Sequence, residues 1–404
     1  MAVKREQQAL ARMIREAARP GQTVAPRCRH FGDCGGCDLQ HLLYPAQLRL
    51  KRQLVAAALA QHPQTSLLPV LEVAPAHEQW RYRNKVEMTF DRREDGALIL
   101  GYSPKRKWWR RIEIEDCWLC SERAMGAALA VRQWAVQAGM APYDQRRHQG
   151  FLRNLALRES RSTGDFLVNL VTAQGPPPAR ELLHALAPFA PSGVVRTIHS
   201  GPAAAVLYER VEVLAGEAMV RERAAGLTFH LSPQSFFQPN GAMASRLVEL
   251  VAQAAELAGA ECLLDMFCGV GTIGLALAAR AREVVGVESV AAAVTGARDN
   301  AAANAIANVR FECATARAYL RDHRGEVPDV VILDPPRPGC GPRVVRRLLE
   351  MRPRRIVYVS CNPWVLAADL AALSAEYDIG PVQPVDLFPQ TIHVESVVAL
   401  TTRD

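Results

Sequence analysis

The sequence predicts an α/β protein. Its C-terminal half is a doubly wound, mostly parallel sheet, and its middle is a separate α+β domain. Two observations predict the C-terminal sheet. From residue 226 onward, short apolar stretches alternate with helix-forming stretches, which is the pattern of parallel strands joined by helices. In addition, one apolar stretch passes through a glycine-rich turn directly into a helix, as it does in nucleotide-binding sheets.

Changes along the chain divide it into three segments. We expect residues 1–27 to form an N-terminal helical arm, because no sheet-sized pattern fits there. Residues 28–225 begin with a cysteine-rich stretch and continue as an α+β central domain. Residues 226–404 carry the alternating pattern of the C-terminal domain.

Strand-like stretches in the central domain are separated by helical stretches and by turn-forming residues. The predicted helices span about 44–60, 121–139 and 179–189. The predicted strands are KVEMTF (85–90), ALILGY (97–102), RRIEIE (110–115), FLVNLVTA (166–173) and AAVLYERVEVL (204–214).

The C-terminal domain is predicted to begin with a helix at 241–258, followed by a strand at 262–267. Two strand–helix repeats come next. Their helices are predicted at 272–281 and 291–305, and the strands that follow them at 283–288 and 309–313. Three further strands complete the predicted sheet, at 329–334, 355–360 and 395–400.

The composition is that of an ordinary globular protein, with 49% hydrophobic and 22% charged residues among 404. The start of the chain is charged throughout and no apolar run is long enough to span a bilayer, so we expect a cytoplasmic protein with reduced thiols. The net charge of +7 favours a polyanionic partner, although a basic surface more often serves solubility alone.

The stretch LLDMFCGVGTIGLALA places a glycine-rich turn between a strand and a helix. Gly269, Gly271 and Gly274 let the backbone turn tightly and present its amides at the start of a helix. Glu288 closes the next strand, where a carboxylate can accept hydrogen bonds from two ribose hydroxyls. The position of Asp265 at the end of the first strand, and the place of the sheet at the end of the chain, favour S-adenosylmethionine over NAD. A purely structural turn is the alternative.

A second loop at the same edge of the sheet lies in the stretch DVVILDPPRPGCG. Asp334 ends its strand, and Pro335 and Pro336 stiffen the turn that follows. A loop of this kind can accept hydrogen bonds from a base or an amino group. It can equally be no more than a rigid turn, so the loop alone does not define a site.

The stretch RIVYVSCNP ends an apolar strand on a thiol, Cys361, at the edge where open α/β sheets bind their ligands. The last strand begins with Glu395. A thiolate that adds to carbon 6 of a pyrimidine makes carbon 5 nucleophilic, so that carbon 5 can accept a methyl group. A base must then remove the proton on carbon 5, after which the thiol leaves. One thiol with a lowered pKa and one carboxylate suffice for this cycle, and we expect His393 to pack or to orient. A core cysteine and a surface glutamate are the structural alternatives.

The stretch CRHFGDCGGC spaces Cys28, Cys34 and Cys37 as C-x5-C-x2-C, and EDCWLC offers Cys117 and Cys120. Clustering of this kind in a reducing compartment indicates a metal or cluster site more than disulfides. Four thiolates suit either zinc or an iron–sulfur cluster. Zinc would use the two paired C-x2-C spacings and leave Cys28 spare, so both remain open on spacing alone.

Basic and aromatic residues alternate in GYSPKRKWWRR, where five basic residues surround Tyr102, Trp108 and Trp109. Such interleaving suits phosphate contact together with base stacking. A solvated hairpin whose tryptophans turn into the core is the alternative. The stretch WRYRNKVEM is similar and contributes Arg83, Asn84 and Lys85.

Five motifs occur in the order SPQSFFQPN, LLDMFCGVGTIGL, LDPPRPG, VSCNPWVLAADL and TIHVES. Together they resemble the family of S-adenosylmethionine-dependent RNA (uracil-5-)-methyltransferases. The stretch WRYRNKVEMTF and the cysteine-rich stretch extend the resemblance to about residue 28. It implies a Rossmann-like methyltransferase domain at 226–404. It also implies methylation of carbon 5 of a uridine in structured RNA, through a covalent bond between cysteine and carbon 6.

The resemblance also implies roles for individual residues. Cys361 would be the nucleophile and Glu395 the base. The expected cofactor contacts are Gln238, Phe267, Thr272, Glu288 and Asp334, the last of them at the boundary between cofactor and base. Many members carry Asp or Asn in the loop after the third strand. Here that loop has Cys313 and Thr315, so no residue is assigned to contact adenine.

Related uracil-5 methyltransferases with the C-x5-C-x2-C pattern and one distant cysteine hold a [4Fe–4S] cluster. The resemblance therefore implies a cluster bound by Cys28, Cys34, Cys37 and Cys117, with Cys120 as a bystander. Its role would be structural or RNA-facing, because four protein thiolates leave no open iron site. Some relatives begin with an additional OB-like RNA-binding barrel, for which 27 residues are too few, so we expect the central domain to hold the RNA.

Large-subunit (23S) ribosomal RNA is the first candidate substrate, and the thymine loop of transfer RNA is the second. A cytosine-5 RNA methyltransferase is a less favoured alternative. A protein whose RNA-binding role outweighs its catalysis is a rival of another class. We expect a monomer with no membrane partner, and a target base that is flipped out or unpaired when it reaches Cys361.

Overall fold

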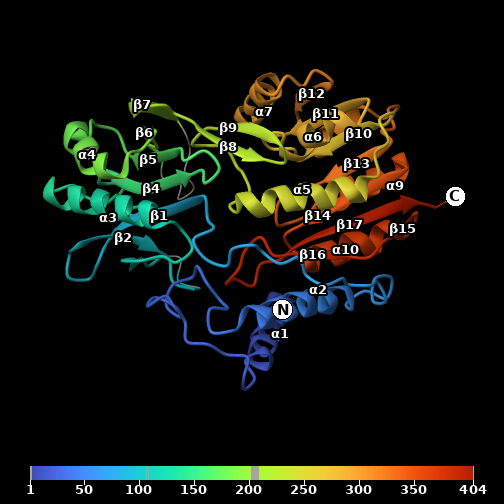
Figure 1. Ribbon diagram of the computed structural model, residues 1–404, viewed down its shortest axis with the longest axis horizontal. Coiled ribbons are helices and arrows are strands. Elements are labelled where there is room, and N and C mark those ends of the chain that lie inside the picture. The colour runs from blue at the N-terminus through green and yellow to red at the C-terminus, as the bar shows by residue number, and fades with distance from the viewer. Residues whose placement is uncertain (1, 106, 108, 202–208, 404) are drawn as a thin grey trace.

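The computed structural model describes residues 2–105, 107, 109–201 and 209–403. Two sheets lie side by side, each with its own helices, and the N-terminal helices lie below them in the view of Figure 1. Trp108 and the first part of the strand predicted at 204–214 lie outside the described residues. No described helix is both long and apolar enough to cross a membrane.

The N-terminal helices pack with the C-terminal half of the chain. Helix α1 (Ala2–Ala17) contacts helix α2 (Tyr44–Leu59). Helix α2 in turn packs against α10 (Pro363–Leu373), and its residues Val55 and Ala58 are part of the core on that side of the C-terminal sheet. Helix α2, which the sequence analysis places in the central domain at 28–225, therefore supports the C-terminal domain in space.

The central sheet has seven strands in the order β3-β2-β1-β4-β5-β6-β7. All neighbouring pairs are antiparallel except β5 and β6. Helices α3 (Glu122–Gln137) and α4 (Ala179–Leu186), the latter continued by the 3-10 helix Ala187–Phe189, share its core. The strands are β1 Lys85–Arg92, β2 Leu98–Tyr102, β3 Ile112–Glu113, β4 Leu152–Glu159, β5 Phe166–Thr172, β6 Gly193–Ile198 and β7 Arg210–Gly216.

Two strands in the interior of this sheet, β4 and β6, are absent from the sequence-based prediction. Each carries buried arginines, which interrupt the apolar pattern: Arg153 and Arg158 in β4, and Arg196 in β6. The fold accommodates such a charge with internal acceptors. The guanidinium of Arg153 donates to the backbone oxygens of His199 and Gly201 at 2.9 and 2.8 Å. These partners are distant in sequence, so no local pattern reveals them.

The C-terminal sheet has the order β12-β11-β10-β13-β14-β17-β15, with β16 paired to β17. Strands β10 to β14 are parallel, and β15, β16 and β17 are antiparallel, which confirms an α/β fold with a mixed, mostly parallel sheet. The strands are β10 Cys262–Met266, β11 Glu283–Glu288, β12 Val309–Cys313, β13 Val330–Leu333, β14 Arg355–Ser360, β15 Tyr377–Ile379, β16 Gln383–Val385 and β17 Glu395–Thr402.

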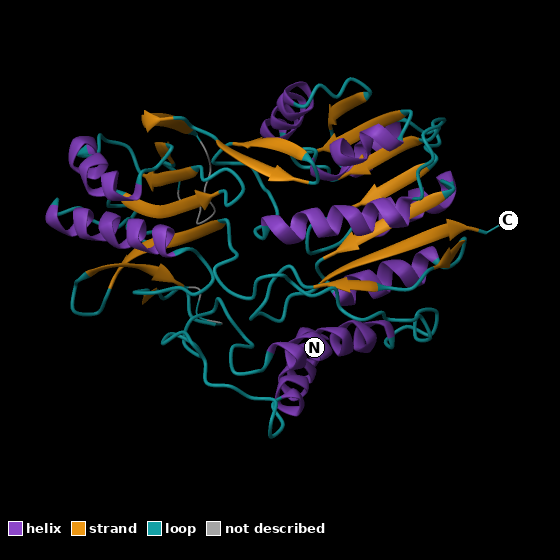
Figure 2. Cartoon of the chain, viewed as in Figure 1, coloured by secondary structure: helices purple, strands orange, loops and turns teal. Residues whose placement is uncertain are grey.

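Helices cover both faces of this sheet (Figure 2). Alternate residues of β14 enter two different cores: Ile356 and Tyr358 face one, and Val357 and Val359 face the other. This alternation is typical of a strand that is buried on both faces. The helices are α5 Gly241–Ala255, α6 Thr272–Leu277 with the 3-10 helix Ala278–Arg280, and α7 Ala291–Ala303. They are followed by α8 Ala316–Asp322, α9 Pro342–Met351 and α10.

A two-stranded hairpin, β8 (Val220–Ala224) and β9 (Leu227–Leu231), lies between the two sheets and forms a sheet of its own. The backbone amides of Thr228 and His230 donate to the side chains of asparagines at the end of α7 and just beyond it. The hairpin therefore packs with the C-terminal domain. The predicted domain boundary between residues 225 and 226 falls in its turn.

Candidate active site

The glycine-rich loop connects β10 to α6 at the carboxyl edge of the C-terminal sheet. Gly269 and Gly271 both have positive φ angles, 56° and 85°, which favour glycine over other residues. A Cβ atom on Gly271 would also lie 2.9 Å from the side chain of Leu275. Both the backbone conformation and the space around it therefore require glycine at this turn.

Asp265 supports the glycine loop from inside the sheet. Its side chain is 1% exposed, and its Oδ2 atom accepts a hydrogen bond from the backbone amide of Gly274 at 2.8 Å. Burial, assisted by the charges of Asp334 and Glu288, raises the pKa of Asp265 to about 7. The second oxygen, Oδ1, is buried without a hydrogen-bond partner among the described residues. A donor group of a bound cofactor would satisfy it.

Glu288 ends β11 beside the loop, where the sequence predicts it. Its carboxylate accepts hydrogen bonds from the backbone amides of Val290 at 2.8 Å and Gly269 at 3.3 Å. On the neighbouring strand, Cys313 lies opposite Glu288 and is exposed. The side chain of Thr315 accepts a bond from the first turn of α8 and so serves as its N-cap.

Phe267 and Thr272 flank the glycine turn. Phe267 has a φ angle of 64°, which is uncommon for a residue other than glycine, and its side chain packs partly against the core beneath α8 to α10. Thr272 is the first residue of α6 and is half-buried. Backbone strain of the kind seen at Phe267 gathers at functional sites.

Gln238 lies in the segment before α5 and is half-buried. Its backbone oxygen accepts a hydrogen bond from the side chain of Asn84 at 3.0 Å, and the backbone amide of Asn84 donates to Pro239 at 2.8 Å. Asn84 is only 5% exposed. Asn84 is therefore buried, and its side-chain and backbone NH groups join the central domain to the segment of Gln238, so its contact with RNA stays a prediction without support from exposure.

Cys361 and Glu395 meet across two neighbouring antiparallel strands. Strand β14 ends at Ser360, which lies opposite Ser396 of β17. Cys361 directly follows Ser360, and Glu395 directly precedes Ser396. The two residues are therefore opposed at the carboxyl edge of the sheet. Directly opposed residues have Cβ atoms about 4.5–5.5 Å apart. Glu395 is 3% exposed, and Cys361 is half-buried.

The residue after Cys361 starts a helix, which explains why the strand stops at the thiol. Asn362 is the N-cap of α10, and its side-chain oxygen accepts a hydrogen bond from the backbone amide of Trp364 at 3.2 Å. Pro363 occupies the first helical position, where its missing N–H costs nothing. The thiol is thereby fixed between a strand end and a helix start.

The surroundings disfavour ionisation of both groups. Burial, followed by the charge of Glu395, raises the pKa of the Cys361 thiol to about 11, and Arg337 opposes this effect. Burial and the charge of Asp334 raise the pKa of Glu395 to about 8, and burial raises the pKa of Asp334 to about 7. The sequence analysis expects a lowered pKa for Cys361, whereas burial and two carboxyl groups outweigh one guanidinium here and raise it.

Arg337, in the loop after Asp334, belongs to the site although the sequence analysis assigns it no role. Its guanidinium donates to Nε2 of His393 at 3.3 Å, and its backbone oxygen accepts from the side chain of Asn362 at 3.2 Å. Burial and Arg337 lower the pKa of His393 to about 4. His393 is therefore neutral near pH 7, which suits an orienting residue. In the sequence, the one signal that could have indicated a role for Arg337 was its place within LDPPRPG.

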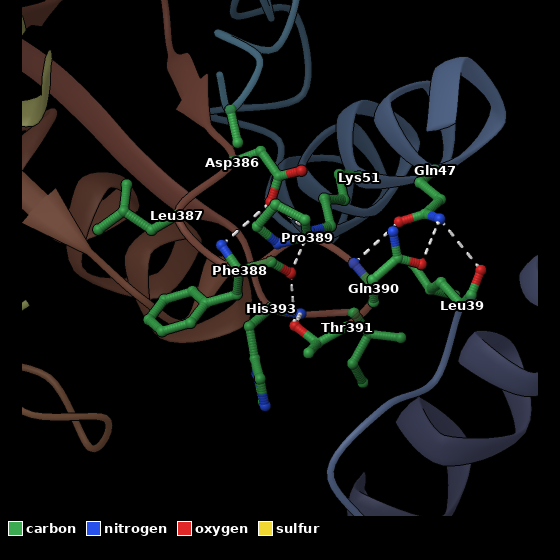
Figure 3. A network of polar contacts seen from close by, with 12 residues as sticks. Leu39, Gln47, Lys51, Asp386, Leu387, Phe388, Pro389, Gln390, Thr391 and His393 are labelled. Carbon is green, nitrogen blue, oxygen red and sulfur yellow. Dashed lines mark hydrogen bonds and ion pairs between the residues drawn. The ribbon is translucent and has the colours of Figure 1, made fainter. Parts of the chain in front are cut away.

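The segment 386–393, which leads into Glu395, is held by the N-terminal part of the chain (Figure 3). The buried Lys51 pairs with Asp386 at 2.5 Å and also donates to the backbone oxygen of Phe388 at 2.9 Å. The side chain of Gln47 donates to that of Gln390 at 3.0 Å and accepts from its backbone amide. These partners are 335 and 343 residues apart in sequence, so sequence reasoning missed them.

Asp38 extends this connection to the cysteine-rich segment. The backbone amide of Asp38 donates to the backbone oxygen of Gln390 at 2.9 Å, and its carboxylate accepts from the amide of Ile392 at 3.3 Å. The adjacent Cys37 is buried. The segment that carries the predicted cluster ligands is thus bonded to the segment that precedes Glu395.

The predicted cluster ligands lie near one another. Burial raises the pKa of the thiols of Cys28, Cys34 and Cys37, and the Cys117 sulfur adds to the rise in each case. Cys120 is fully buried, and its thiol hydrogen-bonds to Cys117, which lowers the pKa of Cys117. Within the described part of the chain, no three His, Cys, Asp or Glu side chains are grouped to hold a single metal ion.

The basic and aromatic residues of the central domain differ in exposure. Trp109 is 59% exposed, which favours the stacking interpretation for that residue, whereas Tyr102 is half-buried. Arg83 and Lys85 are also half-buried, and Arg83 lies close enough to Cys34 to act on its pKa. Trp109 is therefore the strongest stacking candidate in this region among the described residues.

Comparisons with known proteins extend over most of the chain. A family model described as tRNA (Uracil-5-)-methyltransferase matches residues 212–403. The chain is 36% identical to an uncharacterized RNA methyltransferase of Halalkalibacterium halodurans, over 96% of this chain and 85% of that protein. A second uncharacterized RNA methyltransferase, from Listeria monocytogenes, is 35% identical over 95% of this chain and 85% of its own length.

A solved structure agrees with these matches. The Pyrococcus abyssi tRNA (uracil-54, C5)-methyltransferase in complex with S-adenosyl-L-homocysteine superimposes with a TM-score of 0.74 and 32% sequence identity. The match covers 92% of this chain and 86% of that one. S-adenosyl-L-homocysteine is what remains of S-adenosylmethionine after methyl transfer. The chain belongs to the family of S-adenosylmethionine-dependent RNA (uracil-5-)-methyltransferases.

Proposed function

We propose that Cys361 and Glu395 are the nucleophile and the base with which this enzyme methylates carbon 5 of one specific uridine in structured RNA. The observation that carries the proposal is the register of β14 and β17, which sets one thiol against one carboxylate. Both lie at the carboxyl edge of the sheet, beside the glycine loop, where open α/β sheets bind their ligands.

In the first step, the sulfur of Cys361 bonds to carbon 6 of the uracil ring and the thiol loses its proton. A thiol with a pKa of about 11 needs a nearby proton acceptor. Asp334, whose pKa of about 7 makes it a stronger base than an ordinary carboxylate, accepts this proton and leaves Glu395 ionised for the later step. The guanidinium of Arg337 favours both the thiolate and the negative charge that develops on the ring.

Carbon 5 then accepts the methyl group, for which S-adenosylmethionine supplies an electrophilic carbon when it is bound. Carbon 5 now carries a methyl group and a hydrogen. Glu395, ionised, removes that proton, the C5–C6 double bond re-forms, and the bond between carbon 6 and the Cys361 sulfur breaks. A base with a pKa near the working pH is the most effective for this step, and the pKa of Glu395 is about 8.

We propose Gln238, Phe267, Thr272, Glu288 and Asp334 as the residues that hold S-adenosylmethionine. The position of Glu288 beside Gly269 supports contact with ribose hydroxyls, which donate to carboxylates. The Oδ1 atom of Asp265 has no hydrogen-bond partner among the described residues, which supports a hydrogen-bond donor of the cofactor near this atom.

RNA that contains 5-fluorouridine tests the covalent step. Fluorine on carbon 5 cannot be removed as a proton, so the reaction should stop at the methylated adduct. With S-adenosylmethionine present, we expect a complex that survives denaturation for the wild-type protein and none for Cys361→Ser. A substrate RNA that is methylated normally yet yields no adduct when fluorinated would contradict the proposal.

We propose further that Cys28, Cys34, Cys37 and Cys117 hold a [4Fe–4S] cluster. Cys117 and Phe31, the latter within the C-x5-C-x2-C stretch, pack against the hydrophobic cluster that contains Cys37, which supports a common site. A cluster is ligated through four separate irons, so it takes thiolates that are farther apart than those around one zinc ion. Iron and sulfide should co-purify anaerobically with wild-type protein and with Cys120→Ala, and be lost from Cys117→Ala. Stoichiometric zinc in place of iron would contradict this assignment.

Large-subunit ribosomal RNA is the substrate we propose first, as the resemblance of the sequence to the family implies. Transfer RNA is the second candidate, because the matching family model and the similar solved structure are both named for tRNA. Mapping 5-methyluridine in RNA from a deletion strain distinguishes them, since only the true site loses its methyl group. Release of tritium from carbon 5 of cytosine instead of uracil would identify the less favoured cytosine-5 activity.

A further inference from the structure

A hollow of about 440 Å³ lies between α8 and α9, apart from the residues of the proposed reaction. Leu320 and Glu350 contribute to its lining, and all its other lining residues are arginines. We refer to it as the arginine hollow. Its arginines are Arg317, Arg321, Arg324, Arg343, Arg346 and Arg347.

The charges in the arginine hollow are not balanced. Glu350 is the one carboxylate in the lining, and it is shared by Arg346 at 3.6 Å and Arg347 at 2.5 Å. Arg321 pairs with the adjacent Asp322. Three arginines have no carboxylate within ion-pair distance among the described residues: Arg317, Arg324 and Arg343.

The packing of α8 and α9 does not require so many arginines. Helices α8 and α9 are attached to the sheet through apolar residues on their other sides, including Tyr319, Val345 and Leu348. Six guanidinium groups outnumber the carboxylates of Glu350 and Asp322, and the repulsion among the excess positive charges is strongest at low salt. An anion in the arginine hollow would turn that repulsion into attraction.

The arginine side chains of the lining favour binding of several linked phosphate groups. Guanidinium groups are planar and bind phosphate oxygens through paired hydrogen bonds. Arg343 and Glu350 are seven positions apart on α9, or about 10 Å along the helix axis. One strand of a DNA duplex advances about 3.4 Å per phosphate, so the arginine hollow can contact more than one. Its apolar member, Leu320, is 2% exposed, which disfavours a lipid surface.

The helices that line the arginine hollow begin at the edge of the sheet that carries the candidate active site. Arg317 and Arg343 are in the first turns of α8 and α9, which begin at the carboxyl edge of the sheet, where β12 and β13 end. The loop from β13 to α9 also carries Arg337, whose charge acts on Cys361 and Glu395. Positive charge thus continues from the catalytic edge onto the helices.

We propose that the arginine hollow binds phosphodiester groups of the substrate RNA, away from the target uridine, and anchors the RNA while its base is at Cys361. This inference rests on the proposed function, because that function makes RNA the partner. It adds a second contact surface, on the C-terminal domain, to the central-domain contacts expected from the sequence. Free polyphosphate carries the same kind of linked phosphate groups, and the experiment distinguishes it from RNA as the ligand.

The experiment measures binding of a fluorescein-labelled transcript of the substrate RNA, identified by mapping 5-methyluridine in RNA from the deletion strain, over a series of KCl concentrations. The test variant is Arg317→Gln/Arg343→Gln. The matched control, Arg280→Gln/Arg282→Gln, removes two exposed arginines at the amino edge of the sheet, after α6. We expect the test variant to raise Kd about tenfold and to reduce the slope of log K against log salt by about 2, which is roughly one unit per lost phosphate contact. The control should match wild type.

Three further measurements make the result decisive. Equal S-adenosylmethionine affinity in all variants shows that the fold is intact. Cys361→Ser should abolish methylation yet keep the wild-type RNA affinity and salt slope, so failure of the catalytic proposal is distinguishable from failure of the anchor. Wild-type Kd and slope in the test variant would overturn the inference, and so would loss of tripolyphosphate binding without any change in RNA binding.

Discussion

The Nζ atom of Lys51 lies 2.5 Å from Oδ1 of Asp386, and both side chains are completely shielded from solvent. Asp386 also accepts hydrogen bonds from the hydroxyl of Tyr44 at 2.9 Å and from the backbone amide of Phe388 at 3.1 Å. The pair joins α2 to the segment that leads into Glu395. Helix α2 therefore helps to fix the position of the proposed base, although Lys51 and Asp386 are 335 residues apart in sequence.

Replacing Lys51 with Met should destabilise the protein markedly. Asp386 would keep two hydrogen bonds but lose its cation, and a buried charge without its ion-pair partner typically costs about 3–5 kcal/mol. We expect the free energy of unfolding, measured in urea, to fall by about 3 kcal/mol, with part of the loss recovered in Lys51→Met/Asp386→Asn.

A matched control for this prediction is Arg12→Met, which breaks the exposed ion pair between Arg12 and Glu16. Exposed pairs contribute about 0–1 kcal/mol, so this variant should unfold almost as wild type does. Similar losses in the Lys51 and Arg12 variants would show that the buried pair has no special role.

Gly274→Ala should weaken cofactor binding. A Cβ atom at Gly274 would lie 2.8 Å from Oδ2 of Asp265, so the buried carboxylate that supports the loop must shift. We expect the Kd for S-adenosylmethionine, measured by calorimetry, to rise about tenfold, which corresponds to about 1.4 kcal/mol. Gly296→Ala is the control, because its Cβ atom would meet Val270 at an ordinary 3.6 Å. An unchanged Kd for S-adenosylmethionine in Gly274→Ala would contradict a role of the glycine-rich loop in cofactor binding.

Glu395→Gln should change how stability depends on pH. The pKa of Glu395 is about 8 in the folded protein and near 4.5 when the group is unperturbed, so the folded state binds this proton more tightly. The resulting stabilisation is complete below about pH 4.5 and is lost as the pH rises to about 8. Urea unfolding at several pH values should therefore show Glu395→Gln gaining on wild type by a few kcal/mol over this range. The exposed Glu326→Gln is the control, and parallel curves for all three proteins would refute the shift.

The sequence predicted β11 and β14 with their observed bounds, because strands buried on both faces are continuous apolar runs. The bounds of the partly buried edge strand β12 were predicted as well. It also predicted that Cys361 and Glu395 share one edge, since both stand at strand ends. It did not predict β4, in which Arg153 is buried against carbonyl oxygens from elsewhere in the chain. Nor did it predict the direction of the Cys361 pKa, which depends on burial and on Glu395 across the strand pair. Contacts between distant residues, such as Lys51 with Asp386, leave no mark in local periodicity.

The central claim, that Cys361 bonds to the substrate and Glu395 releases it, is tested most directly with Glu395→Gln and unmodified substrate RNA. Without the base, the methylated adduct should accumulate and remain bound to the protein after nuclease digestion. Trypsin yields a peptide of residues 356–403 that contains one cysteine, Cys361, so mass spectrometry can assign the bond to it. We expect that peptide to carry a methylated nucleotide in Glu395→Gln and to be unmodified in Cys361→Ala/Glu395→Gln. Normal turnover by Cys361→Ala, or an adduct on any other peptide, would contradict the account.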